Sequence, residues 1–185
     1  MRHALGLLAV ALVTAAFVFA QPADVGAQSS YDGNVRACNG EQVYLKPAEK
    51  RTLQLHNQTR ADSGAPRLCI DQRLQRAARQ HSADMIRNDY FSHTSQDGTT
   101  FSERVQRAGY TSSGMSVYRI AENIAGGSGS YASPESRHEA WMNSPGHRAN
   151  ILDSDLRHVG IGVAEGTYQG YNGYKMYTVD FGFRR

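Results

Sequence analysis

The spacing of apolar residues changes along this chain, from a helical interval in its first part to alternation near its end. Leu74, Ala78, His81 and Met85 recur every three or four residues, which predicts a helix that starts at the N-cap candidate Asp71. The same kinds of signal predict helices over residues 47–61, 101–108 and 133–142, a helical turn over 147–152, a short extended or helical piece over 118–125, and strands over 158–164 and 174–183.

The order of these elements predicts the fold class. Helices come first and a strand hairpin, joined by a Gly-rich turn over residues 169–173, comes last, which favours an α+β fold. We find no internal repeat and no second domain. Within the hairpin, Tyr177, Val179 and Phe181 alternate with Thr178 and Asp180, the period of a strand with two different faces.

The first residues resemble a secretory leader. Arg2 and His3 precede an uncharged apolar run over residues 4–20, and small residues follow it. We therefore predict a signal peptide over residues 1–27, with cleavage after Ala20 or Ala27, then a polar N-terminal tail over 28–46 and one domain over 47–185. The alternative is an uncleaved membrane anchor, since the run is near the lower limit for spanning a bilayer. No later segment is apolar enough to span.

Composition and charge narrow the function classes. Hydrophobic residues make up 40% of the 185 residues and charged residues 20%, so the chain can bury a core and is not generally disordered. Twenty Lys and Arg stand against seventeen Asp and Glu, without a basic block. The sequence therefore gives little electrostatic support for binding a nucleic acid or an anionic membrane.

The chain has two cysteines, Cys38 and Cys69, and both follow the leader. In an oxidising compartment they are expected to pair, which closes a loop of about 30 residues and stabilises the fold by roughly 3 to 4 kcal/mol in the chain-entropy model. Two cysteines so far apart are too few for a zinc site of their own. The pair thus supports an exported protein.

Several catalytic motifs are absent. His138-Glu139 lacks the second histidine of a zinc-binding HExxH helix, and no Gly-x-Ser-x-Gly elbow occurs. What remains is His93 in a polar loop, Glu122 among small and apolar neighbours, and His147 after a Ser-Pro-Gly turn. Imidazole and carboxylate suit either a metal site or general acid–base chemistry, although for each residue alone a structural role is the stronger explanation.

Six blocks of sequence, in order, resemble one known family. These blocks are Leu55-His56-Asn57-Gln58-Thr59-Arg60, Tyr90-Phe91-Ser92-His93-Thr94, Ala121-Glu122-Asn123-Ile124-Ala125, Trp141 to Leu152, His158 to Val163 and Tyr177 to Gly182. Together they are similar to the bacterial branch of the CAP superfamily, which includes cysteine-rich secretory proteins, venom antigens and plant pathogenesis-related proteins. The resemblance runs from about Pro47 to Phe183.

The resemblance implies a fold and a site. The fold is a three-layer α-β-α sandwich with a central antiparallel sheet. In the family a cleft carries two His and two Glu, which in some members hold a divalent metal, often zinc. By motif, His93 and His147 match the two histidines and Glu122 matches one glutamate. The second glutamate, three residues after the helix tryptophan, is replaced here by Ser144, and Glu139 lies two residues before that tryptophan.

Three functional hypotheses follow for an exported protein of this kind. The first is a binding module that takes a lipid, sterol or peptide, which the missing carboxylate favours. The second is a peptidase-like hydrolase in which zinc-bound water is activated near His93, Glu122 and His147. The third is an extracellular scaffold that meets another protein. A serine-nucleophile role for Ser144 has no marked acid partner or oxyanion hole to support it.

Overall fold

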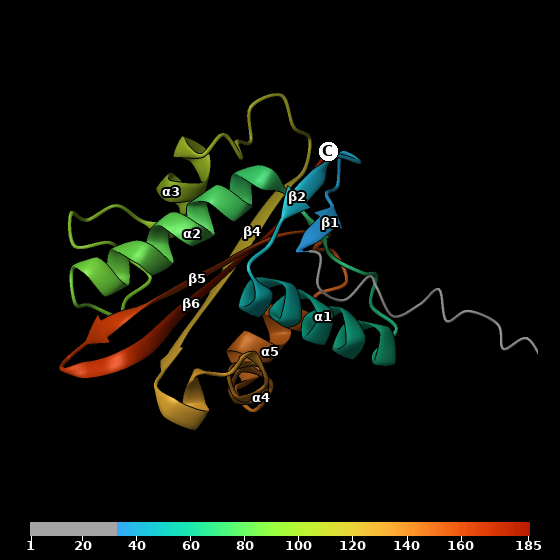
Figure 1. The fold of residues 1–185 in the computed structure, drawn as a ribbon. Coiled ribbons are helices and arrows are strands. Elements are labelled where there is room, and N and C mark those ends of the chain that lie inside the picture. The colour runs from blue at the N-terminus through green and yellow to red at the C-terminus, as the bar shows by residue number, and fades with distance from the viewer. Residues whose placement is uncertain (1–32) are drawn as a thin grey trace, which may run out of the picture. The chain divides into compact units, whose positions relative to one another are not determined.

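The structure is a computed structural model that describes residues 33–185; the predicted signal peptide and its cleavage sites lie outside the described residues. A central four-stranded sheet is covered on both faces by helices (Figure 1). Helices α2 and α3 lie on one face, and α1, α4 and α5 lie on the other. The helices are α1 (Pro47–Asp62), α2 (Gln72–Arg87), α3 (Phe101–Arg107), α4 (Pro134–Met142) and α5 (Pro145–Leu152), with a 3-10 turn η2 (Gly129–Ala132) before α4. The predicted α+β sandwich is confirmed.

The sheet has the strand order β3-β5-β6-β4. Its strands are β3 (Cys69–Ile70), β4 (Tyr118–Gly127), β5 (His158–Tyr168) and β6 (Tyr171–Arg184). The three long strands are antiparallel, as expected, and the two-residue β3 adds a parallel edge beside β5. The segment over 118–125, which the sequence allowed to be extended or helical, is therefore the edge strand β4.

Local signals set the helix boundaries. The Asp71 side chain accepts the backbone N–H of Arg73 at 2.9 Å and begins α2, as predicted. Thr100 and Glu103 form a reciprocal capping box at the start of α3. The turn predicted at 147–152 is a complete helix, α5, because Pro145 occupies its first turn without loss of a hydrogen bond.

Residues 33–46, predicted to be part of a tail, belong to the fold. Strands β1 (Asn34–Arg36) and β2 (Gln42–Tyr44) pair with each other, and Leu45 is fully buried in the main hydrophobic core. Cys38 and Cys69 form a disulfide, as predicted, which joins this segment to β3. The polar composition of the segment gave no strand signal in the sequence. Short strands need few apolar residues of their own when a neighbouring core supplies the packing contacts.

Helix α2 packs unusually close to the sheet. A Cβ at Gly160 would overlap the backbone of Leu74, and one at Gly162 would overlap the carbonyl of Ala78. Only glycine at these two positions allows the backbones to approach so closely. Strand β6, which was predicted to have two different faces, is buried on both of them. Helix α2 covers the face that carries Thr178 and Asp180.

The other face carries the largest core cluster. Trp141 is buried there, as expected, and donates from Nε1 to the Ile124 carbonyl at 3.0 Å. Buried Arg60 donates to four backbone carbonyls, one at the end of α5 and three in nearby loops, and so joins these segments to α1. Across residues 33–185, every helix is too short or too polar to traverse a lipid bilayer.

Candidate functional site

Glu122 occupies the centre of the candidate site. It lies on the edge strand β4, where it pairs with Asp180 of β6, and its side chain is 2% exposed. Oε1 accepts from Nδ1 of His93 at 2.7 Å, and Oε2 accepts from Nη2 of Arg104 at 2.7 Å. Burial alone would raise the pKa of Glu122, but the His93 hydrogen bond and the Arg104 charge lower it below its usual value. Glu122 is therefore a carboxylate, and Nδ1 of His93 carries the shared proton.

Arg104 holds this carboxylate and the preceding loop together. Its Nη1 donates to the carbonyls of His93 at 2.8 Å and Thr99 at 3.3 Å, and its side chain is largely buried. One guanidinium thus fixes the loop that carries His93 and neutralises the charge of Glu122. Fork-shaped donors suit such multiple contacts.

Asp180 is a second buried acid behind Glu122. Burial raises the pKa of Asp180 well above its usual range, and the negative charge of Glu122 raises it further. Asp180 is therefore neutral, because two adjacent carboxylates in a buried site do not both ionise. Its Oδ1 atom has no hydrogen-bond partner within the described part of the chain.

His147 approaches β4 from helix α5. Its Nδ1 lies 2.9 Å from Oγ of Ser144, and its backbone carbonyl accepts from Nδ2 of Asn123 at 3.0 Å. Partial burial lowers the pKa of His147, and the nearby His93 lowers it further. The structure thus brings His93, Glu122 and His147 to the same edge of the sheet; we call them the His–Glu cluster. It reaches solvent through His93, whose side chain is 53% exposed.

The His–Glu cluster does not fit a three-ligand metal centre in this arrangement. Both oxygens of Glu122 already accept hydrogen bonds, and Ser144 contributes a hydroxyl where the family has a carboxylate. Two imidazole Nε2 atoms remain, fewer than the three protein ligands of most catalytic zinc sites. Glu139 does not compensate, since it is exposed on α4 while Trp141, two residues later, is buried.

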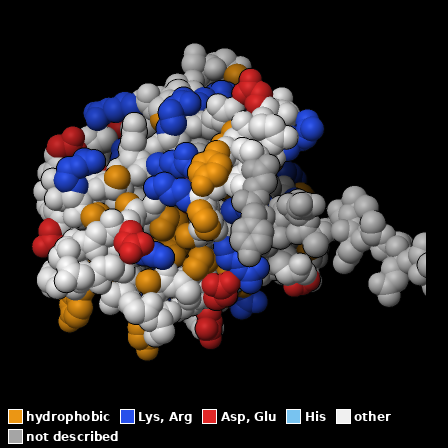
Figure 2. Space-filling model, viewed as in Figure 1, with side chains coloured by type: hydrophobic (Ala, Val, Ile, Leu, Met, Phe, Trp, Pro, Cys, Tyr) orange, Lys and Arg blue, Asp and Glu red, His pale blue; other side chains and the backbone are white. Residues whose placement is uncertain are grey.

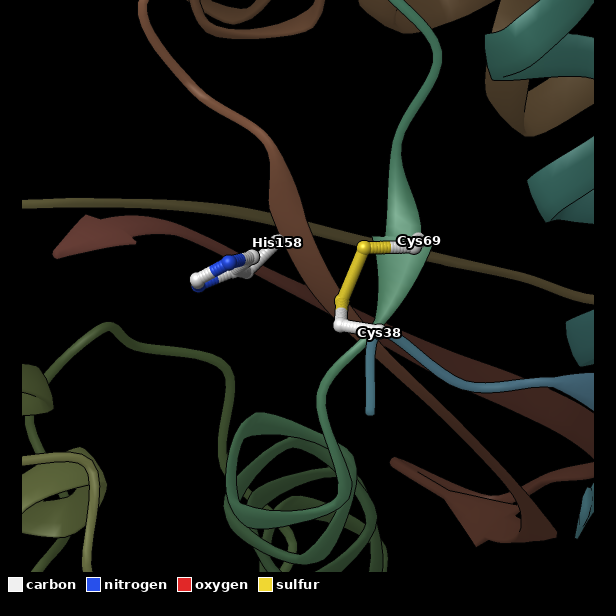
Figure 3. A group of neighbouring side chains, drawn as sticks. All are labelled: Cys38, Cys69 and His158. Carbon is white, nitrogen blue, oxygen red and sulfur yellow. A yellow bond between two sulfur atoms is a disulfide. The ribbon is translucent and has the colours of Figure 1, made fainter. Parts of the chain in front are cut away.

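A different group of residues has donor atoms close enough together to hold a metal ion. Among residues 33–185, the donor atoms of Cys38, Cys69 and His158 lie within 4.8 Å of one another, and the His–Glu cluster forms no such group. Figure 3 shows the imidazole of His158 beside the Cys38–Cys69 disulfide. Disulfide sulfurs are not thiolates, and thiolate is the form that binds zinc. This group is structural.

Sequence reasoning missed Arg104, Asp180 and a role for His81 beside the cluster. His81, assigned to the apolar stripe of α2, is indeed buried, and its Nε2 donates to the Ser92 carbonyl at 2.9 Å. Asp180 had one usable signal, an acid inside an otherwise apolar strand. Arg104 had no such signal, because the sequence of a short helix does not distinguish a buried arginine from an exposed one.

A cavity of about 620 Å³ lies next to the cluster. Arg104, which binds Glu122, and His81 both line it. His93, Glu122 and His147 are not among its lining residues. The cleft that the resemblance implies for these three residues is therefore not this cavity, which adjoins them at Arg104.

The chain was compared with known proteins. Residues 53–181 match the model of the cysteine-rich secretory protein family, CAP. The uncharacterized protein YkwD of Bacillus subtilis is 39% identical over 118 residues, which is 63% of this chain and 42% of that protein. The uncharacterized membrane protein YlbC of the same organism is 35% identical over 116 residues, 63% of this chain and 31% of that protein. The match thus spans less than half of each relative.

Solved structures agree on the fold. An extracellular protein with an SCP domain from Bacillus anthracis superposes with a TM-score of 0.58 at 29% identity, over 77% of this chain and 46% of that one. An outer surface protein of Borrelia burgdorferi superposes with a TM-score of 0.63 at 24% identity, over 77% of this chain and 97% of that one. The second likeness concerns the fold alone.

Proposed function

This chain belongs to the cysteine-rich secretory protein (CAP) family, and we propose that it is an exported binding module whose His–Glu cluster holds a polar ligand. The predicted leader and the Cys38–Cys69 disulfide support export. Family membership alone does not specify an activity, so the proposal rests on the site.

One observation carries the proposal: each imidazole of the cluster is held through Nδ1 and leaves Nε2 for a ligand. Glu122 fixes His93 and Ser144 fixes His147, so both rings are oriented before any ligand arrives. Oriented polar groups at a solvent-accessible rim favour recognition of hydrogen-bonding groups. A polar ligand such as a peptide therefore suits the cluster better than the lipid or sterol that the sequence left open.

The same contacts disfavour hydrolysis. A general base works best with a pKa near the operating pH, but two donors hold the pKa of Glu122 below its usual value. Ser144 contacts His147, yet within residues 33–185 no carboxylate bonds to that ring to complete a triad. Binding without turnover is the function that the geometry supports.

The test follows the side chains of His93 and His147 by NMR in the purified protein while a tetrapeptide or a neutral tetrasaccharide is added. We expect at least one probe to shift both imidazole signals, to be recovered uncleaved, and to bind at least about tenfold more weakly to His93→Ala, as for loss of one hydrogen bond of about 1.4 kcal/mol. The control is Thr94→Ala, an exposed neighbour on the same loop, which should bind like the wild type.

Two outcomes would overturn the proposal. The first is that no probe moves either imidazole signal. The second is that dialysed protein retains one zinc per chain, loses it in His93→Ala, and cleaves the peptide only when zinc is present. That result would establish the hydrolase alternative.

A further inference from the structure

The cavity beside the His–Glu cluster has the character of a second binding site. It lies between the C-terminal half of α2, the loop over residues 95–99 and α3, and its volume is about 620 Å³. Cavities of roughly 300–1,000 Å³ typically accommodate small-molecule ligands. We call it the arginine cavity, because its lining includes Arg79, Arg87, Arg104 and Arg107.

Two of the four guanidinium groups already have strong partners. Arg79 forms two hydrogen bonds to Glu49, at 2.6 and 3.0 Å, and Arg104 bonds to Glu122. These two arginines shape the wall of the cavity.

The other two guanidinium groups have weaker partners and keep N–H groups that can bind a ligand. Arg107 donates to the hydroxyl of Thr99 at 3.0 Å and forms no ion pair within the described chain. Arg87 is 70% exposed, and its Nη1 lies 3.8 Å from Oδ1 of Asp84. A guanidinium fork with free N–H groups matches a carboxylate or a phosphate in a bidentate manner.

Counted with its ion-pair partners, the cavity has no excess of positive charge. Glu49 and Glu122 pair with Arg79 and Arg104, and Asp84 and Asp97 line the cavity together with Arg87 and Arg107. Asp84 accepts hydrogen bonds from Asn88 and from the hydroxyl of Tyr90, and Asp97 accepts the backbone N–H of Thr99. Figure 2 shows Lys and Arg side chains over the part of the molecule where α2 and α3 lie, with Asp and Glu side chains among them. An anion is therefore held by the local N–H groups of Arg87 and Arg107 and not by the net charge of the cavity.

The remaining polar lining suits hydroxyl groups. Gln80, Asn88 and Gln96 present side-chain amides to the cavity. The amide of Gln80 forms no hydrogen bond among the described residues, and those of Asn88 and Gln96 use only their NH₂ groups. Amides both donate and accept, which matches sugar hydroxyls better than it matches a simple inorganic anion.

We propose that the arginine cavity binds a carboxylated oligosaccharide, with one carboxylate on Arg87, another on Arg107, and sugar hydroxyls on the amides. Arg104 lies between the cavity and the cluster, so a ligand that fills the cavity can extend toward His93. The inference rests on the proposed function only in this last respect, since the cavity can bind without the cluster.

The experiment titrates the purified protein with tetragalacturonate and measures the dissociation constant by calorimetry. Arg107→Gln and Arg87→Gln should each weaken binding about tenfold, and binding should weaken as NaCl rises. The control is Arg67→Gln, an exposed arginine in the loop after α1 that removes the same charge and should bind like the wild type. Thermal melts should show that all four proteins are equally folded.

Each alternative result overturns the assignment. Equal binding of a neutral tetrasaccharide, with the same loss in Arg107→Gln, would remove the role of the carboxylate, and an equal loss in Arg67→Gln would reduce the effect to net charge. Tighter binding of a linear polyphosphate, with the same dependence on Arg107, would assign the cavity to phosphate instead. His93 signals that stay still while tetragalacturonate binds would leave this inference standing, so the cavity and the cluster are tested separately.

Discussion

At the scale of single residues, buried polar groups decide most of the chemistry of this protein. His56 is fully buried, stacks on Phe181 with ring centroids 6.0 Å apart, and has its Nδ1 3.1 Å from Nδ1 of His138. Burial, together with the nearby His138 and Arg60, lowers the pKa of His56 to about 3. His56 thus stays neutral in the folded protein and gains a proton readily only when the chain unfolds.

This difference predicts how stability depends on pH. Between pH 6.5 and about 3 the unfolded chain binds a proton at His56 that the folded chain does not, so stability falls as pH falls through this window. By pH 5, His56 should cost about 2 kcal/mol relative to pH 7, at about 1.4 kcal/mol per pH unit. Urea unfolding at both values would measure the change. His56→Phe should show a smaller pH dependence, and equal dependence in both proteins would contradict the assignment.

Arg104 provides a second prediction at this scale. Replacing it in Arg104→Gln removes the charge that helps to keep Glu122 ionised, whereas burial remains, so the pKa of Glu122 should rise. Titration of the Glu122 side-chain carbon by NMR would measure the shift. Arg107 makes no contact with Glu122, so Arg107→Gln is the matched control. An unchanged titration in Arg104→Gln would show that the hydrogen bond from His93 is sufficient to keep the pKa of Glu122 low.

At the scale of elements, the distance between α2 and the sheet positions the site. Gly160 and Gly162 let the backbone of α2 approach β5, and this placement brings His81 and the loop after α2 to the edge where Glu122 lies. The loop then carries His93 to Glu122, and α3 supplies Arg104. The packing of α2 therefore positions one side of the site, and α5 supplies His147 to the other.

Adding a methyl group at this contact should be costly. Gly162→Ala places a Cβ against the Ala78 carbonyl, which is backbone and cannot rotate away, so we expect a loss of about 1 to 3 kcal/mol. The control is Gly146→Ala on α5, where a Cβ meets nothing within 4 Å and alanine favours the helix by up to about 1 kcal/mol. Thermal melting of both variants tests the contrast. Equal melting temperatures would mean that α2 shifts freely.

At the scale of the whole molecule, the disulfide joins the N-terminal segment to the sheet. Cys38 and Cys69 are separated by 31 positions, and their bond connects the loop between β1 and β2 to the strand β3. Leu45, on the far side of β2, is buried in the main core. Residues 33–46 are thus held by the disulfide near their middle and by Leu45 near their C-terminal end.

Removing this link should destabilise the protein through the unfolded chain. The double variant Cys38→Ser, Cys69→Ser should lose roughly 3 to 4 kcal/mol by the loop-closure model, with the cluster intact because neither cysteine contacts it. Denaturant unfolding with and without reductant measures the loss, and the reduced wild type should match the variant. Wild-type stability that survives reduction would show that Leu45 and the β1–β2 pair suffice.

Much of this arrangement is readable before any coordinates, because it depends on neighbours along the chain. Helix caps at Asp71 and Thr100, the strand alternation near the C-terminus and the pairing of two lone cysteines each follow from a few adjacent residues or from a simple count. Motif order also indicated His93, Glu122 and His147 as one site. Only the tertiary structure shows that Arg104 binds Glu122, that Asp180 is a neutral buried acid, and that the cavity lies beside the histidines. These depend on burial and on contacts between residues far apart in the chain, and both arise only when α2 and α3 pack onto the sheet.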